Sequence, residues 1–183
     1  MRIYFTGCHS GGKSTLTRYV SEQYKLPMIN EAARVILNEK ELHLSTLRSD
    51  LHSVNQYQSE VFYRQLEEEN KHKSFVGDRC LIDCVAYAIQ HSSISAKLIN
   101  DPKFAEYIKQ LKASQSLIFF VRPSRSIMVE DGVRETPQWD GMIAIDAIIK
   151  TLYEMNDIRY FQISVDSIQE RIKLIDNVIG LAQ

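Results

Sequence analysis

The sequence has little cysteine and no long hydrophobic run. Its three cysteines among 183 residues are odd in number and too few for a disulfide framework, which favours a reducing, cytoplasmic setting. No apolar run reaches the roughly 18 residues that a membrane-spanning helix needs, and no signal-peptide pattern precedes the first apolar stretch. We therefore expect a cytoplasmic protein with no membrane partner.

An excess of charge of one sign is also missing, because 22 basic and 23 acidic side chains leave a net charge of −1. This balance gives no global field for nucleic acid, so a polynucleotide would need a local basic patch. No internal repeat, low-complexity tract or Pro/Gly-rich linker divides the chain. Length and composition predict a single globular domain over residues 1–183, with the oligomeric state left open.

Short apolar runs alternate with longer segments of helical periodicity, which predicts a parallel sheet covered by helices on both faces. The expected strands are residues 2–6, 26–30, 74–77, 117–121 and 160–165. The expected helices are residues 13–24, 31–40, 47–71, 81–91, 104–113, 138–155 and 167–181. Ligands of such folds bind beyond the carboxyl ends of the strands, so the residues that follow each strand are the functional candidates.

The first strand is followed by a glycine-rich turn, Gly7-Cys8-His9-Ser10-Gly11-Gly12-Lys13-Ser14, which fits the pattern G-x-x-x-x-G-K-[ST] between a strand and a helix. Glycines let backbone N–H groups turn inward, and a helix N-terminus adds positive charge. Lys13 is expected to reach the β and γ phosphates, Ser14 to bind Mg²⁺, and Thr15 to lie near the α phosphate. The turn predicts ATP binding by Gly7, Ser10, Gly11, Gly12, Lys13, Ser14 and Thr15.

Two charged residues, Asp78 and Arg79, follow the third strand. An aspartate here can hold Mg²⁺ or accept the acceptor's proton, and an arginine can bind phosphate or substrate. Asp78 can equally cap the next helix. Asp83, five residues further on, can contact the acceptor or hold Arg79, and the sequence does not decide which.

The fourth strand, in the run LIFFVRPS, ends without the carboxylate that a switch GTPase or motor ATPase usually presents there. This absence counts against both classes. It leaves Asp78 as the candidate acid on the metal side.

The second strand is followed by Glu31, and Arg34 comes three residues later, one helical turn away. A carboxylate in this position can remove a proton from a hydroxyl or hold it by a hydrogen bond, and the arginine can bind a polar group of the acceptor. The residues leave open whether Glu31 or Asp78 is the base, and Glu31 can also be a helix-start glutamate without a catalytic role. If Glu31 is the base, the acceptor is a hydroxyl rather than an existing phosphate.

The segment after the fourth strand, RPSRSIMVEDGVRETPQW, has no strong apolar stripe and contains Arg122, Arg125 and Arg134. A flap with arginines can stabilise the transferring phosphate and exclude water. We expect a small lid over about residues 122–137, with at least one of these arginines catalytic. The alternative is a surface loop with solvated charges.

The glycine-rich turn, the Asp-Arg pair and the arginine-bearing segment together resemble the P-loop kinases. The pattern is similar to the small kinases related to the ribosylnicotinamide kinase domain of NadR, a group also described as AAA-type ATPase domains. The resemblance implies a three-layer α/β P-loop NTPase fold, a five-stranded parallel sheet of order 2-3-1-4-5 with helices on both faces, Mg-ATP as the phosphate donor, and a small lid. It covers most of the chain as an order of elements, while only the P-loop is highly specific.

Two other kinase families bear on the acceptor. The Glu31–Arg34 spacing is similar to that of polynucleotide kinases, and deoxynucleoside kinases have a glutamate at the place of Glu31. Deoxynucleoside kinases and the NadR-like group also place an acceptor-reading glutamine on the helix before the third strand, where Gln56 and Gln58 both fit.

These likenesses imply a kinase that phosphorylates a hydroxyl of a nucleoside, nucleotide or related acceptor. One alternative is a polynucleotide kinase acting on DNA, for example on a hydroxymethylated base such as 5-hydroxymethyluridine. The other is a nucleotide-binding regulatory ATPase that transfers no phosphate.

Overall fold

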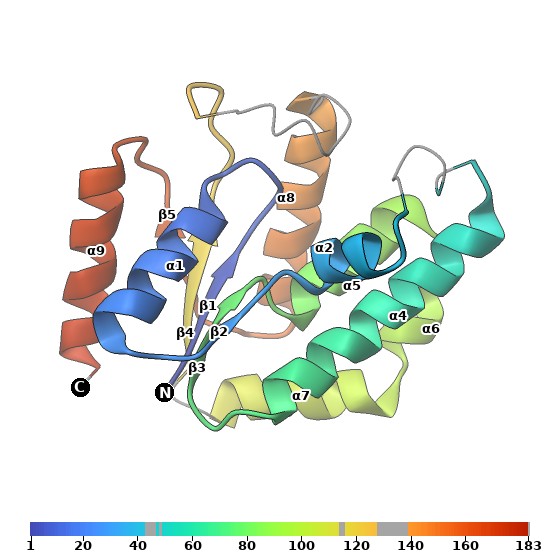
Figure 1. Ribbon diagram of the computed structural model, residues 1–183, viewed down its shortest axis with the longest axis horizontal. Helices are drawn as coiled ribbons and strands as arrows, with labels where there is room; N and C mark the ends of the chain where they lie inside the picture. Colours follow the sequence, from blue (N-terminus) through green and yellow to red (C-terminus); the bar gives the residue numbers. More distant parts are fainter. Residues whose placement is uncertain (43–46, 48, 114–115, 128–138, 183) are drawn as a thin grey trace.

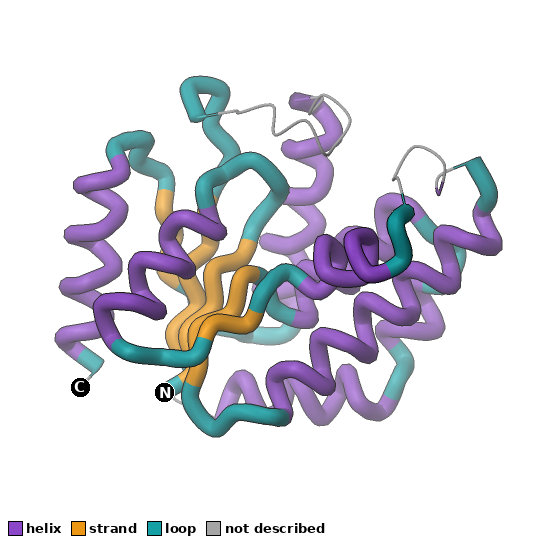
Figure 2. Tube along the Cα trace, viewed as in Figure 1, coloured by secondary structure: helices purple, strands orange, loops and turns teal. Residues whose placement is uncertain are grey.

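Five parallel strands form one sheet in the order β2-β3-β1-β4-β5 (Figures 1 and 2). The strands are β1 (Arg2–Thr6), β2 (Met28–Ile29), β3 (Phe75–Asp78), β4 (Leu117–Val121) and β5 (Phe161–Ile163). The computed structural model describes residues 1–42, 47, 49–113, 116–127 and 139–182. The predicted strand order is confirmed. The edge strands β2 and β5 are shorter than predicted, because residue propensity does not record where pairing with a neighbour stops.

Eight helices lie in the described part of the chain. They are α1 (Lys13–Tyr24), α2 (Ala32–Glu39), α4 (Leu51–Asn70), α5 (Leu81–His91), α6 (Ser95–Ile99), α7 (Pro102–Ala113), α8 (Trp139–Met155) and α9 (Ile168–Leu181). Helices α1 and α5 have the predicted bounds. Helix α6 was not predicted, because its five residues are too few to show a helical period. Within the described ranges, no helix is long and apolar enough to cross a membrane.

The sheet separates two hydrophobic cores. In β1, Ile3 and Phe5 point to one face, where they pack with buried side chains of α1 and α9. Tyr4 points to the other face, into the larger core that includes residues of α4, α5, α7 and α8. Figure 1 shows α1 and α9 on one side of the strands and the remaining helices on the other. This alternation along β1 is the physical origin of the three-layer arrangement.

The larger core contains a buried carboxylate, that of Glu69 near the end of α4, with an exposed fraction of 2%. Its oxygens accept hydrogen bonds from the Tyr4 hydroxyl at 2.7 Å, the Gln65 amide at 2.8 Å and the Tyr107 hydroxyl at 3.2 Å. All of these donors are neutral. Burial raises the pKa of Glu69 to about 7, and the three hydrogen bonds offset only part of that rise. Glu69 is therefore about half protonated at neutral pH.

We predict that Glu69→Gln removes a pH dependence of stability. Because the folded pKa of about 7 lies above the ordinary value of 4.5, the contribution of Glu69 to stability is complete below pH 4.5 and is lost as the pH rises through 7. At 1.36 kcal/mol per pKa unit, the loss in the wild type is about 3 kcal/mol. Glutamine has no ionisable group, so its contribution to stability should not change with pH across this range.

Urea unfolding at pH 5 and pH 8 measures the effect. Relative to the wild type, the free energy of unfolding of Glu69→Gln should increase by about 2.5 kcal/mol between these pH values, because part of the wild-type loss has already occurred at pH 5. Glu67→Gln, an exposed glutamate on the same helix, is the matched control and should follow the wild type. Equal pH slopes in all three proteins would contradict the assignment.

Candidate active site

The glycine-rich turn joins β1 to α1, and two of its glycines are required by geometry. Gly7 has a φ of 131°, and a Cβ atom added there would lie 2.3 Å from the carbonyl oxygen of Val121 in β4. Gly12 caps α1 with a φ of 83°, in the left-handed region. Ser10 also has a positive φ, of 57°, and Thr15 is exposed in the first turn of α1. The chain therefore forms the predicted strand–turn–helix.

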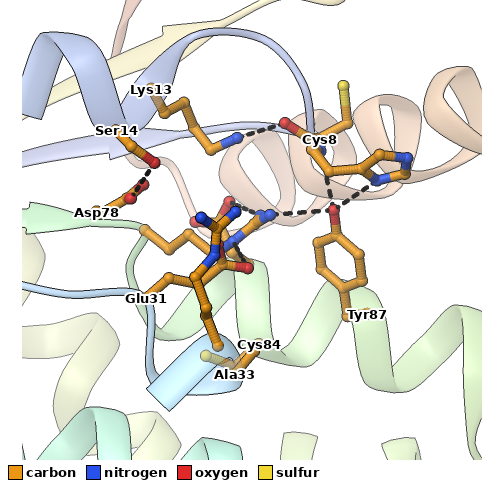
Figure 3. A network of polar contacts seen from close by, with 12 residues as sticks. Cys8, Lys13, Ser14, Glu31, Ala33, Asp78, Cys84 and Tyr87 are labelled. Atoms are coloured by element: carbon orange, nitrogen blue, oxygen red, sulfur yellow. Dashed lines mark hydrogen bonds and ion pairs between the residues drawn. The ribbon is translucent and has the colours of Figure 1, made fainter. Parts of the chain in front are cut away.

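Lys13 lies inside the turn with an exposed fraction of 5%. Its ammonium group donates a hydrogen bond to the carbonyl oxygen of Cys8, at the other end of the turn (Figure 3). Burial and the nearby Arg79 lower the pKa of Lys13 to about 8, against the opposing effect of Asp78 and other acidic groups. The lysine is thus a buried cation at the centre of the glycine-rich turn.

Ser14 and Asp78 meet beside the turn (Figure 3). The Ser14 hydroxyl donates to Oδ2 of Asp78 at 2.5 Å, and this carboxylate is buried with 4% exposed. Its Oδ1 atom is also buried and has no hydrogen-bond partner among the described residues. Hydroxyl and carboxylate oxygens are ligands that Mg²⁺ prefers. The unpartnered Oδ1 atom of Asp78 has lone pairs available to coordinate such an ion. The pair fits a magnesium ion, as the sequence predicts.

Arg79 lies at the centre of the polar network. Its Nε is 2.9 Å from Oε1 of Glu31, and its Nη1 donates to the Gly7 carbonyl at 2.8 Å. Its guanidinium carbon lies 4.7 Å from the ring centroid of Tyr87. Burial by itself would lower the pKa of Arg79, but Glu31, Tyr87 and Asp83 outweigh it and hold the pKa well above its ordinary value. One permanent cation thus joins the glycine-rich turn to Glu31.

Asp83, in the first turn of helix α5, binds the backbone of the glycine-rich turn. Its Oδ1 accepts the Gly7 N–H at 2.9 Å and lies 3.5 Å from Nη1 of Arg79. Its Oδ2 accepts the Cys80 N–H at 3.1 Å, which caps α5. Burial raises the pKa of Asp83, while Arg79 and the Gly7 N–H oppose that rise. Of the two roles that the sequence leaves open, the structure shows the one in which Asp83 holds Arg79.

Tyr87 contacts the site in a way that the sequence reasoning did not predict, since that reasoning assigned it to core packing or to stacking on a base. Its hydroxyl accepts the His9 N–H at 3.0 Å, lies 3.1 Å from Nδ1 of His9, and accepts from Nη2 of Arg79 at 3.3 Å. The tyrosine therefore ties the tip of the glycine-rich turn to Arg79 (Figure 3). A tyrosine on a helix belongs to no motif, so no sequence signal pointed to this role.

The predicted acceptor residues, Glu31 and Arg34, lie at the start of α2, next to Arg79. Glu31 precedes α2 and is buried with 8% exposed. Its Oε2 is 3.9 Å from Nε of Arg34, whose side chain is 44% exposed. Glu31 is therefore placed between a buried and an accessible arginine.

The two candidate glutamines of α4 occupy different environments. Gln58 is buried with 6% exposed and has no hydrogen bond among the described residues. Gln56 is exposed, and its Nε2 lies 3.0 Å from Nε2 of His52 on the helix surface. The structure therefore directs Gln58, and not Gln56, toward the interior.

Two of the three arginines of the expected lid, Arg122 and Arg125, lie in the described part of the chain, and they contact different residues. Arg122 binds the buried carboxylate of Asp146 in α8 through Nε at 2.9 Å and Nη2 at 2.7 Å. The Arg125 guanidinium lies 4.7 Å from the ring centroid of Trp139. Arg134 and most of the expected lid lie outside the described residues. Their catalytic roles remain predictions.

A family model described as "AAA domain" matches residues 2–171. The chain belongs to this family. Among curated proteins, no match to the sequence is found.

Solved structures show how this AAA-domain chain is folded. It is similar to deoxyadenosine kinase from M. mycoides with dCMP and dCDP bound, with 16% identity, all of both chains covered and a TM-score of 0.72. It is also similar to the NadR protein in complex with NAD and AMP-PNP, with 15% identity and a TM-score of 0.66 over 98% of this chain and 49% of NadR. Shikimate kinase from Aquifex aeolicus matches with 13% identity and a TM-score of 0.60, over 100% of this chain and 98% of that one. These likenesses confirm the predicted P-loop kinase fold.

We predict that ATP affinity falls above pH 8. Lys13, with a pKa of about 8 in the free site, must be protonated to bind phosphate. Its charge is present below that pH and is lost above it. The dissociation constant of ATP should therefore rise about tenfold for each pH unit above 8, a range in which the ATP phosphates are already ionised.

Titration calorimetry from pH 7 to pH 9.5 measures this slope. Lys13→Ala should bind ATP weakly at every pH and show no slope, and Lys25→Ala, a lysine just beyond α1, should behave as the wild type. A wild-type affinity that stays constant to pH 9.5 would overturn the assignment of Lys13.

Proposed function

We propose that this AAA-domain protein is an ATP- and Mg²⁺-dependent kinase that transfers the γ-phosphoryl group to a hydroxyl of a nucleoside, nucleotide or related small acceptor. One observation carries the proposal: the buried guanidinium of Arg79 contacts the glycine-rich turn on one side and Glu31 on the other. A carboxylate able to accept a proton is thereby held beside the turn that binds phosphate. A protein that only binds nucleotide has no need of this pairing.

On the donor side, each residue has a role that follows from its position. ATP supplies the phosphoryl group, and Mg²⁺ when bound neutralises charge on its phosphates. The backbone N–H groups of the turn bind phosphate oxygens, and Lys13 contributes its ammonium charge. Ser14 and Asp78 would hold the metal ion. Thr15, which is exposed at the start of α1, would contact the α phosphate.

On the acceptor side, Glu31 orients or deprotonates the attacking hydroxyl, and Asp78 is the alternative base. Arg34 binds a polar group of the acceptor, since its side chain is the more accessible of the two arginines beside Glu31. The guanidinium of Arg79 is already paired with Glu31. If Arg79 also binds the acceptor, the acceptor must contact the same guanidinium as Glu31. We favour Gln58 over Gln56 for reading the acceptor, because its buried amide has no described partner.

The named neighbours support a nucleoside-type acceptor. Deoxyadenosine kinase is described with dCMP and dCDP, and NadR with NAD and AMP-PNP in one complex and with NR in another. Shikimate kinase, described elsewhere with shikimate bound, has the same fold with a non-nucleoside acceptor. The acceptor of this chain must therefore be found by assay.

A screen with ATP labelled at the γ phosphate tests the proposal. The acceptors are nucleosides, mononucleotides, hydroxy acids such as shikimate, and oligonucleotides with and without 5-hydroxymethyluridine. We expect label on a small hydroxyl acceptor, with little dependence on salt, and none with Lys13→Ala.

Two other outcomes would contradict the proposal. Transfer to oligonucleotide with a steep loss of activity on adding salt would show a polynucleotide kinase, because a polymer acceptor releases counterions on binding. ATP consumption that no acceptor stimulates would show a regulatory ATPase.

We predict that Glu31→Gln and Arg34→Ala have different kinetic effects. Glutamine keeps the size and hydrogen-bonding reach of Glu31 but cannot accept a proton, so kcat should fall by about 10²- to 10⁴-fold with little change in KM for ATP. Arg34→Ala should mainly raise KM for the acceptor, since Arg34 binds rather than transfers.

Steady-state kinetics on the acceptor found in the screen decide between these effects. Glu39→Gln, a surface glutamate on α2, is the matched control and should leave both constants unchanged. An unchanged kcat in Glu31→Gln, with the fold intact by circular dichroism, would move the base to Asp78.

A further inference from the structure

A second buried arginine, Arg171, contacts the glycine-rich turn from the opposite side of the sheet. It lies in the first turn of α9 and has an exposed fraction of 2%. Its Nη1 donates to the Gly11 carbonyl at 2.7 Å, and its Nε donates to the Val165 carbonyl, in the loop after β5, at 2.6 Å. The guanidinium therefore joins the turn to the loop between β5 and α9.

The charge of Arg171 has no ionic partner in the described part of the chain. Both of its hydrogen-bond acceptors are neutral carbonyl groups, and its buried Nη2 has no partner there. Burial lowers the pKa of Arg171, and Asp166 opposes this only in part. The Asp166 carboxylate itself accepts a hydrogen bond from Ser126.

A buried cation that forms no ion pair is costly, and a hydrophobic side chain of similar size would fill the same space. Packing therefore does not account for an arginine at this position. An anion that binds nearby would account for it.

The contact with Gly11 also determines the direction of a neighbouring amide. No described peptide bond is cis, so the Gly11 carbonyl and the Gly12 N–H point in opposite directions from the same planar unit. Because the carbonyl points to Arg171, the Gly12 N–H points away from it, as a phosphate-binding amide of this turn must. A Cβ atom added at Gly12 would lie 3.4 Å from Nη1, so the guanidinium packs directly against the N-terminus of α1.

We propose that Arg171 is a positioning residue of the donor site: it orients the Gly11–Gly12 peptide and provides a buried positive charge that a bound polyphosphate compensates. This inference rests on the proposed function for its donor, an ATP-like polyphosphate. It concerns the phosphate chain and not the nucleoside. The effect of Arg171 on binding must then depend on the presence of phosphates.

The test measures dissociation constants for ATP, inorganic triphosphate and adenosine by calorimetry, with adenosine measured by competition where it binds weakly. Arg171→Gln should weaken ATP and triphosphate by about 10- to 100-fold, the range for hydrogen bonds to a charged group, and leave adenosine unchanged. Arg171→Lys keeps the charge but has no fork to join two carbonyls, so its loss should be smaller. Lys173→Gln removes an exposed charge from the same helix and should have no effect.

Several results would overturn the inference. One is a change of less than threefold in triphosphate binding by Arg171→Gln. Equal weakening of adenosine and triphosphate would show a purely structural role, and an equal loss in Lys173→Gln would show a general charge effect. If Arg171→Gln does not fold, Arg171→Lys decides, and normal triphosphate affinity in that variant would refute the positioning role.

The outcome is separate from that of the kinase proposal, because no acceptor is present. If the wild type binds ATP but phosphorylates nothing in the screen, the kinase proposal fails and the Arg171 comparison remains decisive. If the wild type binds neither ATP nor triphosphate, both proposals fail.

Discussion

The arrangement of the site depends on the ion pair between Arg79 and Glu31. The guanidinium of Arg79 also contacts the Gly7 carbonyl and the Asp83 carboxylate, so one buried cation organises two acids and a backbone turn. Such a group is stable inside a protein only when its donors are used and its charge is compensated. The consequence is that the glycine-rich turn and the Glu31 carboxylate are held next to each other through one side chain. The contacts that compensate the charge of Arg79 are the same contacts that fix the positions of Glu31 and the glycine-rich turn.

Strand order brings these residues together. In the sheet, β3 lies between β2 and β1, so residues far apart in the chain leave the sheet at the same edge. Glu31 follows β2, Asp78 ends β3, and Gly7 follows β1. The carboxyl ends of three adjacent parallel strands thus bring together the three groups to which the proposed function gives the roles of base, metal ligand and phosphate-binding turn. Helix α5, which follows β3, completes the site through Asp83 and Tyr87.

The sequence predicts the parts of this site that depend on local pattern. The turn from Gly7 to Ser14 is recognisable because its spacing by itself requires a strand–turn–helix, and the strand order follows from the family resemblance. Asp83 and Tyr87 act through contacts with residues more than seventy positions away, which no local pattern records. The same holds for Arg171, which reaches Gly11 across 160 positions.

Other limits of the sequence reasoning have geometric causes. Gln56 and Gln58 are two residues apart, which places them on different faces of a helix, and only packing shows which face is buried. Arg122 reads from the sequence as a free lid arginine because its partner, Asp146, belongs to a helix that begins beyond the lid. Short edge strands were overestimated because the end of a strand is determined by its neighbour. Each of these points depends on tertiary contact and not on residue type.

The buried Glu69 makes folding a reaction that binds protons. At pH 7 the unfolded glutamate is ionised, whereas the folded one is about half protonated, so folding takes up about half a proton from the buffer. The heat of unfolding then includes the ionisation heat of whichever buffer receives that proton. Two laboratories that melt this protein at the same neutral pH, one in phosphate and the other in Tris, will record different calorimetric enthalpies for one and the same transition.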